Sequence, residues 1–414
     1  MEISEEMRRF IAGNADKDAD TLRLEWHGKN PGFDVSAAID QIHCRRKCRS
    51  KLEWFLHYPD FLFPDTSVAE QSSDEILALY NASIINGVST VADLTAGLGI
   101  DALTFALRGL KVTAVELNSR RAEILELNAR LLNILNFNVI NDDFLKWLEE
   151  NPNARFDVIF LDPARRDDKK GRSFLLQDSS PNVIENRPIL FRHASKIVIK
   201  ASPLLDITQT FRDLPETTDI QIVCINNECK EVLIIMSQTD LGKVLAPDIT
   251  VIDLKRNISE YPAGQPEIIS SFIIPVSDIK GGDVDYADFS DLQVGSYLYE
   301  ENAGIRKVQA TAALQKRFPG LRALSADSHG FVSETLYDDF PGRVSEIKEI
   351  MKRPDSKSLS AHGMRVVSMG YGMTPPQLRK KFKIREGEEE TCGFLKLHDN
   401  TRWVLITGPR CNRR

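Results

Sequence analysis

Two aspartates flank a glycine-rich turn in the stretch Val91-Ala-Asp-Leu-Thr-Ala-Gly-Leu-Gly-Ile-Asp101. Asp93 ends an apolar run that is typical of a buried strand, and Asp101 opens an apolar helical pattern. Gly97 and Gly99 permit a tight turn and a close approach of the backbone to a ligand. The amides of the following helix would point toward the same place. A carboxylate on each side of this turn suits a ligand with a cationic or amine-bearing group better than it suits a pyrophosphate.

Carboxylates also stand where the next three strands of the pattern end. Glu116 ends the second strand, where a carboxylate can accept hydrogen bonds from both hydroxyls of a ribose. Asp142 and Asp143 end the third, where one of them can accept from an adenine amino group, although Asp143 is equally suited to cap a helix. Asp162 ends the fourth. Ligands bind outside the carboxyl ends of the strands in an open parallel sheet, so we expect these acids to meet in one site.

This arrangement indicates S-adenosylmethionine, a sulfonium that carries an amino acid, as the cofactor. A dinucleotide is the alternative, because Gly97–Ala102 fits G-x-G-x-x-A and Glu116 lies at a spacing compatible with a ribose-binding acid. The acids beside the turn would repel its pyrophosphate, and no pair of residues that could handle a hydride is apparent. The predicted cofactor ligands are Asp93, Thr95, Gly97, Gly99, Asp101, Glu116, Asp142 and Asp143, and the predicted catalytic residues, beside the reacting methyl group, are Asp162 and Pro163.

Strands and helices alternate from Val91 onward, which predicts an α/β fold with a parallel sheet and helices on both faces. The helix predicted over 119–135 should bury the face formed by Ile124, Leu127, Leu131 and Leu135. Ser72 or Ser73 is expected to cap the helix before Val91, and residues 305–318 are expected to form one helix. The expected strands are 112–116, 138–142, 156–161 and 196–200, followed by an antiparallel hairpin of 219–225 and 231–236.

The chain has 414 residues, too many for one ordinary core, so two or three domains are expected. Its formal net charge of −7 is not that of a strongly basic, nucleic-acid-binding chain. Contacts with nucleic acid would have to come from local basic runs at 45–49, 165–172 and 379–385. Such runs are more often a solvated face than a binding site.

Cysteine use and hydropathy indicate a cytoplasmic protein with no membrane partner. The sequence holds six cysteines, which form no disulfide framework in a chain of this length. No apolar run approaches the ~20 residues that span a bilayer, and the acidic N-terminus lacks the apolar segment of a signal peptide. His43, Cys44 and Cys48 do not match a zinc spacing, so no metal is expected.

Residues 70–240 resemble the class I S-adenosylmethionine-dependent methyltransferases. Asp93-Leu-Thr-Ala-Gly-Leu-Gly, Glu116 and Asp162-Pro163 look like their first, second and fourth motifs. This resemblance implies a Rossmann-like, seven-stranded methyltransferase sheet that is mostly parallel, with the last strand antiparallel. The segments 295–306 and 340–344 further resemble a bacterial group assigned as RNA methyltransferases. The implied domains are an N-terminal helical lobe (1–85), a methyltransferase domain (86–242), a linker with a ferredoxin-like segment (243–325) and a THUMP-like α+β domain (326–414).

The acceptor is less clearly indicated. Amino-directed methyltransferases commonly have Asp or Asn, two prolines and an aromatic residue after the fourth strand, whereas this chain has Asp162-Pro-Ala-Arg165. The stretch also looks like the Asp-Pro-Pro-Arg of uridine-C5 enzymes, but their cysteine nucleophile is absent from Lys200-Ala-Ser-Pro203. Asp162 would orient the acceptor or take its proton. The residues predicted to hold substrate phosphates are Arg165, Arg166, Lys169 and Arg172.

The favoured hypothesis is an enzyme that methylates a base of ribosomal or transfer RNA, with its C-terminal domains docking the RNA. One alternative is a non-catalytic module that binds RNA or protein and keeps a vestigial cofactor pocket, which the altered Asp162-Pro-Ala-Arg165 stretch motivates. Another keeps the methyltransferase but gives it a protein or small-molecule acceptor.

Overall fold

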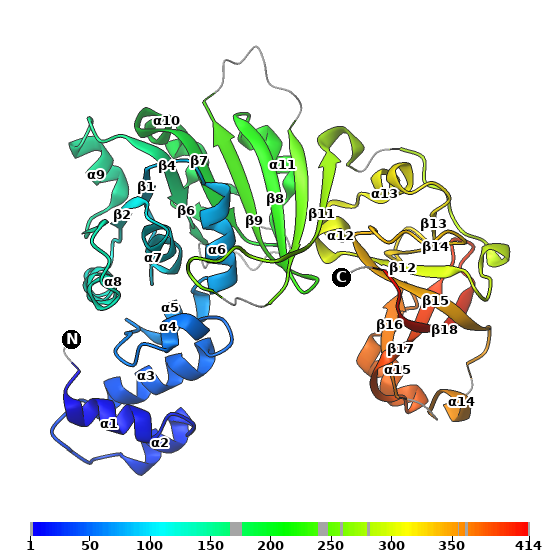
Figure 1. Ribbon diagram of the computed structural model, residues 1–414, viewed down its shortest axis with the longest axis horizontal. Helices are drawn as coiled ribbons and strands as arrows, with labels where there is room; N and C mark the ends of the chain where they lie inside the picture. The colour runs from blue at the N-terminus through cyan, green and yellow to red at the C-terminus, as the bar shows by residue number, and fades with distance from the viewer. Residues whose placement is uncertain are drawn as a thin grey trace. The chain divides into compact units, whose positions relative to one another are not determined.

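The computed structural model describes residues 3–165, 176–238, 247–256, 260–279, 282–354, 356–360 and 363–412 (Figure 1). Its contacts divide the chain into two compact units. The first consists of 1–218, 231–244 and 255–267, and the second of 219–230, 245–254 and 268–414. The division into four domains stays a prediction. None of the described helices is long and apolar enough to cross a membrane.

The first unit begins with a helical lobe, as predicted. Its helices are α1 (Glu5–Gly13), α2 (Ala19–Glu25), α3 (Val35–Cys48), α4 (Glu53–Leu56), α5 (Thr66–Gln71) and α6 (Glu75–Ile84). Phe10, Leu22 and Ile39 share one small core that joins α1, α2 and α3. Asp74, and neither of the two predicted serines, caps α6, because its carboxylate accepts from the amide of Ile76.

The strands of the first unit follow the predicted order. They are β1 (Thr90–Asp93), β2 (Lys111–Val115), β3 (Phe137–Ile140), β4 (Phe156–Leu161), β7 (Ala194–Ala201) and β9 (Glu228–Ser237), the last beginning in the second unit. Their order across the sheet is β9-β7-β4-β1-β2-β3. The five central pairings comprise four parallel ladders and one antiparallel ladder, between β7 and β9. The parallel sheet with an antiparallel last strand is therefore confirmed.

Helices connect these strands as α7 (Ile100–Leu107), α8 (Ser119–Leu131), α9 (Phe144–Glu150), α10 (Val183–His193) and α11 (Ile207–Asp213). The order of strands reverses between β1 and β4. Because crossovers between parallel strands are right-handed, α7 and α8 must cover one face, and α9 and α10 the other. The point of reversal is where an open α/β sheet forms its ligand crevice.

The buried face predicted for α8 is confirmed at Ile124 only, while Leu127 and Leu131 are half-buried. The helix ends at Leu131, and Leu135, expected to be buried, is 96% exposed. Asn133 adopts a left-handed conformation with a φ of 55°, which stops the helix before the pattern is complete. The buried residues of α8 are Ala122, Ile124, Leu125, Asn128 and Ala129.

Asn128, on α8, forms hydrogen bonds with the segment that precedes α5. The amide of Leu62 donates to Asn128 Oδ1 at 2.9 Å, and Asn128 Nδ2 donates to the carbonyl of Leu62 at 2.9 Å. The side chain is 1% exposed, so water cannot replace these bonds. The pair therefore fixes the position of the segment before α5.

We expect Asn128→Ala to lower the free energy of unfolding by about 2–3 kcal/mol, because it leaves a buried N–H and C=O without partners. Urea denaturation of the full chain measures the change. Asn151→Ala is the matched control, since Asn151 is exposed and, among the described residues, its side chain donates only to the carbonyl of Trp147. It should change stability by less than about 0.5 kcal/mol. Equal losses in the two variants would contradict this role of Asn128.

The second unit contains the strands β8 (Thr217–Ile225, beginning in the first unit), β10 (Asp248–Leu254) and β11 (Ile268–Pro275). β10 is parallel to β8 and antiparallel to β11. Asn226 and Asn227, which follow β8, both have positive φ, as a tight hairpin turn into β9 requires. β10 and β11 were not among the predicted strands, because they lie in a stretch taken for a linker.

A separate seven-stranded sheet fills the rest of the second unit, in the order β13-β14-β12-β15-β18-β17-β16. The expected helix over 305–318 is two helices, because Gln309 has a φ of 56° and ends the first. The strands are β12 (Tyr297–Glu301), β13 (Arg322–Ala323), β14 (Gly330–Ser333), β15 (Gly342–Met351), β16 (Gly363–Met369), β17 (Arg385–Lys396) and β18 (Arg402–Arg410). The helices are α12 (Ala303–Val308), α13 (Thr311–Arg317), α14 (Ser356–Ser360) and α15 (Pro375–Phe382).

The remaining described elements are short. They are β5 (Ala164–Arg165), β6 (Ser179–Ser180) and three 3-10 turns at Leu176–Asp178, Val276–Asp278 and Phe289–Asp291. β5 pairs with β6 in an antiparallel ladder just after the end of β4.

Candidate functional site

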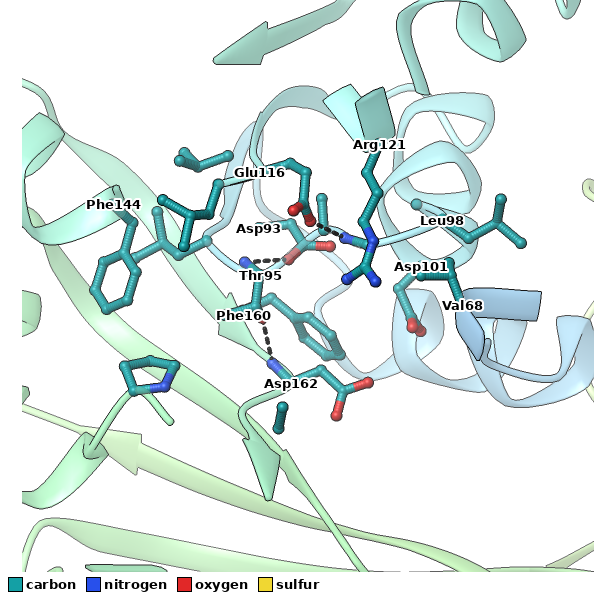
Figure 2. Close-up of a pocket in the computed structure, with 18 of the residues that line it drawn as sticks. Val68, Asp93, Thr95, Leu98, Asp101, Glu116, Arg121, Phe144, Phe160 and Asp162 are labelled. Atoms are coloured by element: carbon teal, nitrogen blue, oxygen red, sulfur yellow. Dashed lines mark hydrogen bonds between the residues drawn. The ribbon is translucent and has the colours of Figure 1, made fainter. Parts of the chain in front are cut away.

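A cavity of about 350 Å³ opens at the carboxyl ends of β1, β2, β3 and β4 in the first unit. All eight predicted cofactor ligands line it, together with Asp162. Figure 2 shows the carboxyl groups of Asp93, Asp101, Glu116 and Asp162 around this space. Pro163, the other predicted catalytic residue, is buried. It is not one of the described residues that line the cavity. The topology therefore gathers residues that lie as much as 69 positions apart, from Asp93 to Asp162.

Backbone amides of the glycine-rich turn hold two of these carboxylates (Figure 2). The amide of Thr95 donates to Asp93 Oδ1 at 3.1 Å, and the amide of Gly97 donates to Glu116 Oε2 at 2.9 Å. The hydroxyl of Thr95 accepts from the amide of Asp162 at 2.6 Å. The turn after β1 is thus connected to the ends of β2 and β4, so the site is preorganised.

Gly97 and Gly99 both have left-handed φ angles, of 58° and 82°, and they differ in their surroundings. A Cβ at Gly99 would lie 2.2 Å from Leu125 Cδ1, and Leu125 is fully buried in α8. A Cβ at Gly97 would meet no atom within 4 Å. At Gly99 both the left-handed backbone and the contact with Leu125 disfavour any side chain. At Gly97 only the left-handed backbone does so.

We expect Gly99→Ala to cost about 2–3 kcal/mol of stability, from the backbone strain and the displacement of Leu125. Gly97→Ala serves as the control and should cost only about 1 kcal/mol, for the left-handed backbone. Thermal unfolding of both variants without ligand measures the difference. If the two variants lose the same stability, the contact with Leu125 is not what requires a glycine.

Asp143 is the helix cap that its position also suggested. Its Oδ1 accepts from the amides of Leu145 and Lys146, at 2.9 and 3.1 Å, at the start of α9. Asp142 forms an ion pair with Lys146, with Oδ2 and Nζ 3.0 Å apart, and this hydrogen bond lowers the pKa of Asp142. Both aspartates line the cavity, but part of each carboxylate is already used within the protein.

Asp101 is engaged by neighbours that the sequence did not suggest. Its Oδ1 accepts from Asn81 Nδ2 at 2.9 Å, and its Oδ2 accepts from the hydroxyl of Ser73 and from Lys200 Nζ, the latter at 3.4 Å. Lys200 Nζ also donates to Asp162 Oδ2 at 2.6 Å. The charge of Lys200 thus partly neutralises Asp101, which was predicted to face a cationic ligand. Lys200 was missed because a lysine after an apolar strand also fits a solvent-exposed end.

Two further carboxyl groups are buried beside this cluster. Asp93 is 3% exposed, and burial, reinforced by the charges of Asp101 and Asp162, raises its pKa to about 8. Glu231 is 2% exposed on β9, and burial raises its pKa to about 8 as well, although Lys200 opposes this shift. Raised carboxyl pKa values beside a cavity are typical of functional sites, and a further positive charge nearby would lower both pKa values.

Most of the predicted phosphate-binding run lies outside the described residues. The backbone of Arg165 belongs to β5, and nothing is described of its side chain. Arg166, Lys169 and Arg172 lie outside the described residues. Their two described flanks, β5 and β6, pair with each other, and Ala164 and Ser180 line the cavity. The described residues on either side of the run thus include two that line the cavity.

Comparisons with known proteins match both units. A model of the family described as conserved hypothetical protein 95 matches residues 75–202, and a model of a ferredoxin-like domain matches residues 297–341. A crystal structure of a "putative methyltransferase" from Porphyromonas gingivalis W83 covers 99% of this chain and 100% of its own, with a TM-score of 0.80 and 25% identity. The chain has a methyltransferase fold. The ferredoxin-like match overlaps the segment predicted for it, 243–325, and extends to 341.

A curated relative covers a shorter stretch. An uncharacterized RNA methyltransferase of Mycoplasma mobile is 37% identical over 90 residues, which are 21% of this chain and 24% of the relative. The chain therefore matches about a quarter of the length of that protein.

Proposed function

We propose that this protein binds S-adenosylmethionine in the cavity of its first unit and transfers the methyl group to RNA. The observation that supports this most directly is that acids from four neighbouring strand ends line one cavity of about 350 Å³. That volume is typical of small-molecule sites. The deeply buried Asp93, whose pKa is raised to about 8, would be stabilised in its ionised form by a cationic ligand.

The lining residues fit the parts of this cofactor. Bound there, it would supply a methyl group activated by a sulfonium charge. Asp93, Thr95 and the backbone of Gly97 and Gly99 would hold its amino acid end, close to Asp101, and Glu116 its ribose. Phe144, with Asp142 and Asp143, would hold the adenine; Asp143 Oδ2 stays available because its cap uses Oδ1. Asp162, with Pro163 behind it, would orient the acceptor.

RNA as the acceptor is supported by the name of the Mycoplasma mobile relative and by exposed basic residues. In the second unit, Lys380 and Lys381 on α15 and Lys383 after it are exposed. We propose that this THUMP-like part docks RNA through such groups. The predicted run of Arg165, Arg166, Lys169 and Arg172 would hold phosphates at the site itself. All six cysteines are free, which suits the reducing cytoplasm where we place the reaction.

Titration calorimetry with S-adenosylmethionine tests cofactor binding, and Asp93→Ala should weaken it. Absence of binding to the wild type, or equal binding by the variant, would contradict the proposal. Transfer of a labelled methyl group to total RNA from a gene-deletion strain tests the acceptor. Label that resists ribonuclease would indicate a protein or small-molecule acceptor. Cofactor binding without any transfer would favour a module with a vestigial pocket.

A further inference from the structure

Lys200, which contacts the cavity residue Asp162, has not yet been given a role in the reaction. Lys200 lies one residue before the end of β7, and its side chain is 11% exposed. Its Nζ donates to Asp162 Oδ2 at 2.6 Å, to the hydroxyl of Ser73 at 2.7 Å and to Asp101 Oδ2 at 3.4 Å. An ammonium group has three donors. These acceptors use all of them and fix the group in place.

The charge of Lys200 is permanent at neutral pH. Burial alone would lower its pKa, but the charges of Asp101 and Asp162 outweigh burial and raise the pKa above the usual lysine range. The charge of Glu231, a buried residue of β9, also raises the pKa of Lys200. Lys200 therefore cannot remove a proton from an acceptor, and its effect on the reaction must come from its positive charge.

Asp162 connects this buried charge to the acceptor. Its side chain is 43% exposed and lines the cavity, whereas Lys200 lies behind it. Lys200 holds Oδ2, while Oδ1 accepts no hydrogen bond from any residue that the structure describes. A proton-bearing acceptor in the cavity can therefore donate to Oδ1, with the lysine charge one carboxylate away.

A fixed positive charge at this place distinguishes between two kinds of acceptor. A neutral amino nitrogen that attacks a sulfonium methyl group becomes positively charged, and a neighbouring ammonium opposes that change. A hydroxyl oxygen instead passes its proton to a base as it attacks, and it ends as a neutral ether, with no positive charge for the ammonium to oppose. The residues after β4 agree with this distinction, since Asp162-Pro-Ala-Arg165 offers no aromatic ring on which a base could stack.

We infer that the acceptor is a hydroxyl oxygen, in RNA the ribose 2′-hydroxyl, with Asp162 as the base and Lys200 as the residue that positions and polarises it. This inference rests on the proposed function. The hydroxyl proton passes to the Asp162 carboxylate as the oxygen lone pair forms the bond to the methyl carbon. The electron pair of the breaking C–S bond stays on sulfur, which becomes a neutral thioether. Asp162 then releases the proton to water, to which it is exposed.

The position of the methyl group in the product tests the inference directly. Total RNA from a gene-deletion strain is incubated with the full chain and labelled S-adenosylmethionine. One half is hydrolysed with alkali, and the other is digested to nucleosides for mass spectrometry. We expect alkali-resistant, labelled dinucleotides and a ribose fragment heavier by one methyl group. Label on a base would overturn the hydroxyl acceptor and leave the proposed function intact. Cofactor binding with no labelled RNA would instead overturn the proposed function.

Substitutions of Lys200 test whether it positions Asp162 for the reaction. We expect Lys200→Met to bind S-adenosylhomocysteine within about threefold of the wild type by calorimetry, while its kcat falls at least about 100-fold. Lys200→Arg, which keeps the charge, should recover part of the loss. The double variant with Asp162→Asn should be little slower than either single variant. Lys196→Met, on the same strand, is the control and should retain wild-type turnover.

These measurements separate a positioning role from a structural one. A Lys200→Met protein that unfolds or fails to bind S-adenosylhomocysteine would overturn the positioning role, provided that Lys200→Arg is equally inactive. Additive losses in the double variant would also overturn it, because the two residues would then act independently. Partial recovery in Lys200→Arg together with non-additive losses is the result that the geometry predicts.

Discussion

Asp162→Asn should lower the rate of methyl transfer by about 100- to 10,000-fold and leave the affinity for S-adenosylmethionine within about threefold. This loss corresponds to about 3–5 kcal/mol of transition-state stabilisation. The asparagine keeps the shape of the side chain and cannot accept the proton of the acceptor. The fold should survive, because Lys200 keeps its bonds to Ser73 and Asp101 and because the amide of residue 162, which bonds Thr95, belongs to the backbone.

The chain offers a closely matched control for this prediction. Asp60 is also ion-paired at 2.6 Å, with Arg8, and its side chain is 38% exposed, against 43% for Asp162. It does not line the cavity. Asp60→Asn should therefore retain both turnover and cofactor affinity, measured by transfer of labelled methyl groups and by calorimetry. Full activity of Asp162→Asn would show that this carboxylate neither takes the proton nor orients the acceptor.

The site could be predicted largely because of its chemical pattern. Asp93 ends β1 and Glu116 directly follows β2, two strands whose last residues are buried, and the topology of parallel strands brings such ends together. The structure places these acids around one cavity. Whether each binds the predicted part of the cofactor stays a prediction until binding is measured.

Lys200 shows what the pattern alone could not reveal. Its sequence context, Lys196-Ile-Val-Ile-Lys200, has a lysine at each end of a short apolar strand, and either could be solvated. Only the fold shows that one of them is buried against Asp101 and Asp162. A usable signal was present, since Lys200 occupies the carboxyl end of the strand after β4, the edge at which the acids were expected.

The errors in the elements have local causes. Leu135 continues the apolar spacing of α8, but the left-handed Asn133 ends the helix first, and spacing does not report backbone conformation. Asp143 was suited to two roles; the structure shows that it caps α9 through Oδ1, and its part in cofactor binding stays a prediction. The extra strands β10 and β11 were missed because their stretch was interpreted as a linker from its prolines and mixed composition.

The buried Asp93 makes cofactor binding dependent on pH, and Asp93→Asn should remove most of that dependence. Without ligand the pKa of Asp93 is about 8, so most of the carboxyl groups are protonated at pH 6. A cationic ligand favours the ionised form, so binding expels a proton below pH 8, and affinity rises with pH. We expect the wild type to bind S-adenosylmethionine about tenfold or more tightly at pH 8 than at pH 6, measured by calorimetry.

The same raised pKa has the opposite effect on the stability of the unliganded protein. The folded state keeps a proton on Asp93 that the unfolded state loses above pH 4, so this residue contributes less stability as pH rises toward 8. Asp93→Asn should therefore be more stable than the wild type at pH 8, by about 2 kcal/mol, while binding the cofactor about ten- to 100-fold more weakly. Thermal unfolding without ligand at pH 5.5 and pH 8 measures the stability difference.

Asp142→Asn is the control for both effects. Its hydrogen bond with Lys146 lowers the pKa of Asp142, so this carboxylate stays ionised from pH 6 to pH 8. The variant should keep the wild-type slope of affinity against pH, whatever its absolute affinity. If Asp93→Asn keeps that slope too, the proton expelled on binding comes from another group, and the burial of Asp93 is not what tunes the site for a cation.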